Sequence, residues 1–212
     1  DRPAVVSRRV PSPVNATPRL ATPAELDTVA RVFAEALAPD PMITWPFPPA
    51  TTVDDVTTLF QILLQHAYGS LGVIWVVGDE RVEAAAAWLP PEQVSRFQEI
   101  EVATRPRIEA LTDDGGGRYA VFWDWLGEHL PTEPCWFLDI LAVRSAARGR
   151  GLASALVRHG LDRAHGAGQP AVLETGNPAT LPMYEHLGFR VVERADAPDG
   201  GPTIWFLRAD PA

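Results

Sequence analysis

Residues 135–157 read CWFLDILAVRSAARGRGLASALV and carry the clearest structural pattern in the chain. The apolar run 136–143 predicts a buried strand, the basic, glycine-rich segment 144–151 predicts a turn, and the residues after it predict a helix. Gly149 and Gly151 lack a Cβ, so the backbone can turn sharply there and approach a ligand closely. The first turn of the helix directs unpaired N–H groups and the positive end of its dipole toward an anion. The stretch therefore predicts a cradle for a pyrophosphate group.

The spacing of this cradle differs from that of the common phosphate loops. The chain has neither Gly-x-x-x-x-Gly-Lys-Ser/Thr nor Gly-x-Gly-x-x-Gly with an acidic residue about twenty positions later. It has instead Arg148-x-x-Gly151-x-Ala153 behind a Leu-Ala-Val strand. This pattern resembles the coenzyme A loop of the GCN5-related N-acetyltransferases (GNAT).

A second motif supports the same resemblance. Residues 173–189 read LETGNPATLPMYEHLGF and predict a strand, a polar turn and a short helix. Asn177, and Tyr184 followed by Gly188-Phe189, are similar to the Asn and Tyr-x-x-x-Gly-Phe pattern of that family. Because the two motifs occur in the family's order, separated by a helix and a strand, they are more specific together than either is alone.

A narrower resemblance is to puromycin N-acetyltransferase and related drug acetyltransferases. It extends over about Arg19–Arg208 and is looser within residues 40–130, where such enzymes build the acceptor site. The segments that carry it are 129–138, 173–175, 181–185 and 198–208.

The resemblance implies a fold and a cosubstrate. The fold is α/β (α+β), with a mixed central sheet of about seven strands between helices in three layers. Acetyl-CoA would place its pantetheine along the strand 136–143 and its pyrophosphate at the cradle. The residues implied in coenzyme binding are Leu141, Ala142, Val143, Arg148, Gly149, Arg150, Gly151, Leu152, Ala153, Ser154, Asn177 and Tyr184. Arg148 is alternatively an exposed loop charge, and Asn177 a turn residue beside Pro178.

The resemblance also implies direct attack of an unprotonated amine on the thioester. A backbone N–H of the strand would hold the oxyanion. Tyr184 would protonate the departing thiolate as a general acid, because a phenol with a pKa of about 10 keeps its proton at neutral pH. The alternative role for Tyr184 is a packed aromatic residue before Gly188-Phe189.

A base is also needed, since an alkyl ammonium group has a pKa of about 10. The candidates are Glu174, at the end of a strand, and Asp139, in the middle of an apolar strand. A carboxylate at position 139 is costly unless it is paired or lines a cleft. The drug acetyltransferases have a small apolar residue there, so Asp139 is a departure from their pattern and is either a base or a residue that recognises the amine.

The acceptor pocket is expected to draw on an acidic residue and several aromatic ones. His129 is either part of that pocket, as a base, or a structural residue of its Pro-rich turn. Core packing is the alternative for each tryptophan. The residues predicted for the pocket are Asp40, Trp45, Trp88, Trp123, Trp125 and His129.

Length and composition set further bounds. We expect residues 1–16 to be a flexible leader and residues 17–212 to form one acetyltransferase domain. No run approaches the roughly 18 apolar residues of a membrane helix, and no secretory signal is visible. The single cysteine, Cys135, favours a cytoplasmic location. The net charge of −9 argues against nucleic acid as a partner, the five scattered histidines indicate no metal site, and a monomer or a homodimer is expected.

The hydrophobic periodicity places the other elements. Residues 39–49, rich in proline, are expected to be irregular. The first predicted helix begins at Thr22 and is ended by Pro39. The other predicted helices cover 52–68, 92–112, 118–130, 152–165 and 181–187. The predicted strands cover 19–21, 73–77, 82–89, 136–143, 171–175, 189–193 and 203–207.

The sequence therefore predicts an acetyl-CoA-dependent N-acetyltransferase that acts on a small amine, such as an antibiotic or an amino-nucleoside. Two other readings stay open. One has a protein N-terminus or a lysine side chain as the acceptor, and the other is a non-catalytic domain that binds acyl-CoA.

Overall fold

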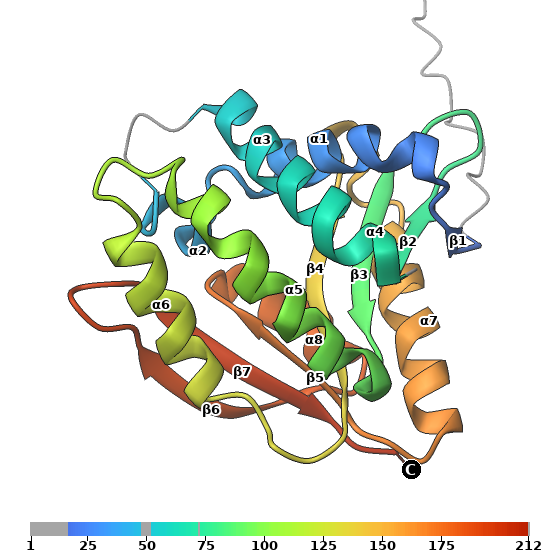
Figure 1. Cartoon of the computed structure of the whole chain (residues 1–212). Coiled ribbons are helices and arrows are strands. Elements are labelled where there is room, and N and C mark those ends of the chain that lie inside the picture. The colour runs from blue at the N-terminus through green and yellow to red at the C-terminus, as the bar shows by residue number, and fades with distance from the viewer. Residues whose placement is uncertain (1–16, 48–51, 72, 212) are drawn as a thin grey trace, which may run out of the picture.

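The structure, a computed structural model, describes residues 17–47, 52–71 and 73–211 (Figure 1). The leader predicted over residues 1–16 lies outside this part of the chain. A seven-stranded sheet has the order β1-β2-β3-β4-β5-β7-β6, which confirms the predicted mixed sheet. Its strands are β1 Arg19–Leu20, β2 Ile74–Val77, β3 Ala84–Leu89, β4 Trp136–Val143, β5 Ala171–Thr175, β6 Arg190–Asp196 and β7 Thr203–Ala209.

Helices cover both faces of the sheet. Figure 1 shows α1, α3 and α5 in front of β3 and β4, and apolar side chains of α1 and α3 share one core cluster with β2, β3 and β4. Side chains of α7 and α8 share a second cluster with alternate residues of the same strands, and α6 packs on β7 in a third. The long helices are α1 Leu26–Leu37, α3 Val53–Leu63, α5 Pro91–Glu109, α6 Gly117–Glu128 and α7 Leu152–Gly166.

The short elements follow local sequence signals. Thr22 and Glu25 form a capping box at the start of η1 Pro23–Glu25, because the hydroxyl and the carboxylate satisfy the free N–H groups of that turn. The other short elements are α2 Pro41–Thr44, the π-helical η2 Leu64–Tyr68, α4 Gly69–Leu71, η3 Ser145–Ala147, η4 Pro178–Thr180 and α8 Leu181–His186.

Two predicted segments need correction. Residues 39–49 are not wholly irregular, since α2 begins after Asp40, whose side chain accepts a hydrogen bond from the Met42 N–H at 2.9 Å; residues 48 and 49 lie outside the described chain. The helix predicted over 52–68 is α-helical only to Leu63 and continues as a π-helical turn. Neither change was visible in the apolar periodicity.

Strands β4 and β5 are the parallel pair of the sheet, and they pair only at their beginnings. The register joins Trp136 to Ala171 and Phe137 to Val172, and no pairing is recorded beyond these two positions. Strand β4 nevertheless continues to Val143 and stays paired with β3 on its other edge. The backbone edge of β4 that faces β5 is therefore free of strand partners after Phe137.

Candidate active site

A cavity of about 450 Å³ opens where β4 and β5 separate. One wall consists of residues 138–143 of β4, the end of β5 and α8, and the other of α1, α2, α3, η2 and α6. Cavities of this size, with a few convergent polar groups in an apolar lining, are typical of small-molecule sites. Three carboxyl groups line it, those of Asp40, Asp139 and Glu174.

A β-bulge places Asp139 in this cavity. Ala87 pairs with Ile140 whereas Trp88 pairs with Leu138, so Asp139 is the extra residue of β4. As a result, Leu138 packs into the cluster around α7 while Ile140 packs into the cluster around α1. A regular strand would place both on one face, since side chains alternate with a period of two. Bulges of this kind redirect a side chain and occur often beside active sites.

Among the described residues, the hydrogen-bond donor to Asp139 is the phenol of Tyr68. Tyr68 is the last residue of the π-helical turn η2 and is itself buried. Burial disfavours the ionised carboxylate and raises the pKa of Asp139 to about 7. Asp139 is therefore poised to gain and lose a proton near neutral pH.

Glu174 is the second buried carboxyl group. Its Oε2 atom has no hydrogen-bond partner among the described residues. Burial, and then the charge of Asp139, raise the pKa of Glu174 well above its usual value. Because two carboxylates in one apolar site repel one another, the pair holds at least one proton at neutral pH.

Tyr184 on α8 lines the same cavity. Its ring packs edge-on against Phe189, with centroids 5.9 Å apart. Burial, and then the negative charges of Glu174 and Asp40, raise the pKa of Tyr184. The phenol therefore keeps its proton over the whole physiological pH range.

The glycine-rich turn has the geometry of an anion cradle. Gly149 and Gly151 both adopt left-handed φ angles, of 74° and 77°, and a Cβ on either would meet nothing within 4 Å. No side chain caps the first turn of α7, so its first N–H groups lack intrahelical and side-chain acceptors. Together with the free edge of β4, this cradle fits the pyrophosphate and pantetheine of a coenzyme A thioester.

The side chains around the cradle differ in where they point. Arg148 lines the cavity, as do Leu141, Ala142, Val143 and Ala153. Arg150 forms an ion pair with Glu83 at 2.7 Å, and its side chain is not among those that line the cavity. Leu152 is buried in the core, and it and Ser154 lie in the first turn of α7. Asn177 lines the cavity, but its side chain caps η4 by accepting from the Ala179 N–H at 3.1 Å.

The predicted acceptor residues separate into two groups. Asp40 and Trp123 line the cavity, as predicted. Burial raises the pKa of Asp40, and the indole N–H of Trp123 is buried without a partner in the described chain.

Trp88 and Trp45 do not reach the cavity, which corrects their placement. Trp88 is 1% exposed, and its indole N–H donates to the carbonyl oxygen of Leu156 at 3.2 Å. Trp45 packs against Phe122, with ring centroids 6.0 Å apart. Trp88 is a core residue that packs against α7, and Trp45 is a partly buried residue that packs against α6.

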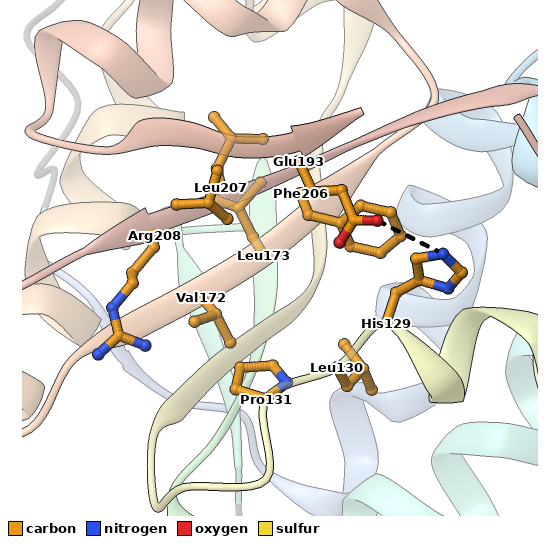
Figure 2. A pocket seen from close by; sticks show the side chains of 10 residues that line it. His129, Leu130, Pro131, Val172, Leu173, Glu193, Phe206, Leu207 and Arg208 are labelled. Atoms are coloured by element: carbon orange, nitrogen blue, oxygen red, sulfur yellow. Dashed lines mark ion pairs between the residues drawn. The ribbon is translucent and has the colours of Figure 1, made fainter. Parts of the chain in front are cut away.

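His129 and Trp125 also lie outside the cavity. The His129 ring stacks on Phe206 at 5.1 Å, and its Nδ1 is 2.9 Å from the Trp125 carbonyl oxygen. Figure 2 shows the imidazole facing Glu193 across a separate pocket of about 260 Å³, with Nε2 and Oε1 3.6 Å apart. His129 therefore holds the Pro-rich turn against β6 and β7, which corrects its placement at the acceptor site.

Sequence reasoning missed Tyr68. It stands at the end of a predicted helix without any motif around it, and only the fold brings it to Asp139. A tyrosine on an apolar helix face is ordinarily a core residue, so no local signal could have identified it.

The comparison with known families agrees with this geometry. The model of the acetyltransferase (GNAT) family matches residues 33–189. The chain belongs to this family. The predicted enzyme class, an acyltransferase, is the class of the GNAT family.

Two mycothiol acetyltransferases are similar over part of the chain. That of Corynebacterium glutamicum (strain ATCC 13032) is 40% identical over 80 residues, which are 36% of this chain and 27% of the relative. That of Mycobacteroides abscessus is 35% identical over 107 residues, 49% of this chain and 36% of the relative. This GNAT chain thus spans about a third of the length of these relatives. Both of these relatives are mycothiol acetyltransferases. The narrower likeness to drug acetyltransferases therefore stays a prediction.

Solved GNAT structures match nearly the whole chain. A histone acetyltransferase HPA2 and related acetyltransferase from Corynebacterium glutamicum is 25% identical, with a TM-score of 0.68, over 92% of this chain and 96% of that one. Drosophila melanogaster polyamine N acetyltransferase is 14% identical, with a TM-score of 0.59, over 92% and 99%, and this likeness shows the fold alone. Among the described residues, every helix is too short or too polar to cross a bilayer.

Proposed function

We propose that this GNAT protein is an acetyl-CoA-dependent N-acetyltransferase that acetylates a primary amine of a small molecule. The observation that supports the proposal most strongly is one cavity that joins an anion cradle, the free edge of β4 and two buried carboxyl groups that act on one another. A phosphate-binding domain alone would need the first of these features but not the others.

The coenzyme would be held by the turn and by β4. The N–H groups that begin α7 and the guanidinium of Arg148 would bind its phosphates, and the edge of β4 along Leu141–Val143 would pair with its pantetheine. The bound thioester supplies the acetyl group. In the overall reaction an N–C bond forms and a C–S bond breaks, so that one amide and one thiol are produced.

Asp139 is the base that we favour over Glu174. An incoming ammonium group must give up a proton before its nitrogen can attack, and a base with a pKa of about 7 is well matched to neutral pH. Burial, and then the charge of Asp139, oppose the ionisation of Glu174 and raise its pKa well above its usual value. Because a protonated carboxyl group cannot take up a further proton, Glu174 would instead help to position the amine through its Oε2 atom, which has no partner among the described residues.

Tyr184 would supply the proton that the leaving thiolate needs. Its hydroxyl keeps its proton beside the cavity, where a departing thiolate needs one. A backbone N–H of β4 would hold the oxyanion. These roles use only groups that line the same cavity.

Two classes of small-molecule acceptor fit the proposal. An antibiotic or an amino-nucleoside is our first candidate, from the resemblance to drug acetyltransferases. The acceptor of mycothiol acetyltransferases is the second, favoured by the 40% identity over 80 residues. A protein acceptor is less compatible with this site, because Asp139 and Glu174 are buried within the cavity.

A mass-spectrometric screen tests the proposal. The protein is incubated with acetyl-CoA and with amine antibiotics, amino-nucleosides, the acceptor of mycothiol acetyltransferases and a mixture of peptides. We expect acetylation of a small amine with release of one thiol per product. Transfer to peptides alone would contradict the small-molecule acceptor, and coenzyme binding without any transfer would show a non-catalytic module.

A further inference from the structure

The acceptor side of the cavity has a composition that restricts the amine it can bind. Its helical wall is formed by aliphatic and aromatic side chains of α1, α2, α3 and α6, and among the described residues that line it Asp40 is the one with a charge. The opposite wall carries the other two carboxyl groups and the coenzyme cradle. The two walls therefore differ in polarity.

The three carboxyl groups of the cavity lie near the end of β5 and act on neighbouring groups there. A Cβ built on Gly176 would lie 3.6 Å from Asp40 Oδ1, so Asp40 sits beside the end of β5, which also carries Glu174. The charges of both Asp40 and Glu174 act on Tyr184, and that of Asp139 acts on Glu174. An ammonium group is attracted to this end, and Arg148 is the one cationic side chain among the described lining residues.

A second part of the cavity lining is an aromatic row. The ring of Tyr119 lies between those of Phe47 and Trp123, with centroid distances of 5.9 and 6.0 Å. All three residues line the cavity. No carboxyl group of the described cavity lining belongs to this row, although the charges of Glu101, Glu109 and Asp124 act on Tyr119 from outside the lining.

We infer that the acceptor is a monoamine whose body is a flat apolar or aromatic ring system, rather than a diamine or an amino sugar. This inference rests on the proposed function. The ammonium group binds at Asp139 and Glu174 beside the thioester, and the ring system packs against Phe47, Tyr119 and Trp123. A polyhydroxylated body finds few donors or acceptors on that wall, and a second ammonium group finds no carboxylate within the aromatic row.

Trp123→Leu tests the wall, and Trp75→Leu is its matched control. Trp75 is a partly buried tryptophan on β2 whose ring contacts Arg163, away from the cavity lining. We expect Trp123→Leu to raise the KM for a phenylalkylamine about tenfold and to leave the KM for acetyl-CoA unchanged. Trp75→Leu should change neither constant.

The deciding experiment compares acceptors. Thiol release from acetyl-CoA is measured with 2-phenylethylamine, 1,4-diaminobutane and glucosamine, while calorimetry measures the binding of coenzyme A separately. We expect kcat/KM to be at least tenfold higher for 2-phenylethylamine than for the other two. A preference for the diamine or the amino sugar overturns this inference and leaves the acetyltransferase standing. Coenzyme binding without thiol release from any amine overturns both, and equal KM changes in the two tryptophan variants overturn the role of the wall.

Discussion

The phenol of Tyr68 donates a hydrogen bond to Oδ2 of Asp139, although the two residues are 71 positions apart in the chain. Each comes from an irregular element, Tyr68 from a π-helical turn and Asp139 from a β-bulge. Both irregularities are frequent at functional sites. The π-helical turn and the bulge together give the buried carboxyl group of Asp139 a hydrogen-bond donor. Asp139 is the centre of the proposed chemistry.

Tyr68→Phe removes that donor while keeping the ring. The bond favours the ionised carboxylate, so its loss should raise the pKa of Asp139 further, by about one unit or more. The acidic limb of the kcat/KM profile should move to higher pH by the same amount. Tyr119→Phe removes a cavity phenol that has no recorded bond to Asp139 and should leave the midpoint of that limb in place. An unchanged midpoint in Tyr68→Phe would show that Tyr68 does not affect the pKa of the catalytic base.

Asp139→Asn should change stability in a pH-dependent direction. The pKa of Asp139 is raised by burial from 3.8 to about 7 in the folded protein, so the unfolded chain releases the proton first as the pH rises. The stability that the protonated group provides below about pH 4 is therefore lost progressively up to about pH 7, by a few kcal/mol. Asparagine cannot ionise and avoids this loss.

Denaturant unfolding at pH 5 and pH 8 checks this expectation. The variant should gain stability relative to the wild type between these two pH values. Asp162→Asn, on an exposed residue of α7, should show no such gain. A loss of stability in Asp139→Asn that is equal at both pH values would mean that Asp139 is ionised throughout and paired.

Arg148→Ala should weaken coenzyme binding. Arg148 is an exposed residue at the cradle and lines the cavity, so its removal takes away a charge-assisted contact with phosphate. We expect the Kd of coenzyme A in calorimetry to rise about tenfold at low ionic strength, and less in high salt because exposed charges are screened. Arg158→Ala, an exposed arginine further along α7, is the matched control. The same Kd in both variants would exclude Arg148 from the phosphate site.

Tyr184→Phe separates catalysis from binding. The ring and its contact with Phe189 are kept, but the proton for the leaving thiolate is lost. We expect kcat to fall by about 10²–10³, typical of a lost general acid, with the Kd of coenzyme A unchanged. A kcat equal to that of the wild type would assign Tyr184 to packing alone.

The sequence predicted the elements of the site better than its contacts. Strands β4 and β5 have the bounds expected from their apolar runs, and Gly149 and Gly151 have the positive φ angles that the cradle motif requires. These features depend on neighbouring residues, so local pattern suffices to predict them. The cost of a carboxylate at position 139 was also evident from its apolar neighbours.

The bulge, the π-helical turn and the bond between them depend on residues far apart in the chain. The apolar periodicity predicted a uniform helix over 52–68. It could not show the π turn, because such a turn changes the hydrogen-bond partners without changing which residues are apolar. The tryptophans show the same limit. Trp88 and Trp123 are equally apolar in sequence, yet one fills the core against α7 and the other faces the cavity.

The most direct test of the central claim is thiol release from acetyl-CoA across pH 6–9, in the wild type and in Asp139→Asn, with mass spectrometry of the amine product. We expect one thiol per acetylated amine in the wild type. In the variant, kcat/KM should fall at least a hundredfold near pH 7 and recover as rising pH deprotonates the amine in solution. Wild-type rates in Asp139→Asn at every pH, or no thiol release with any amine in the wild type, would contradict it.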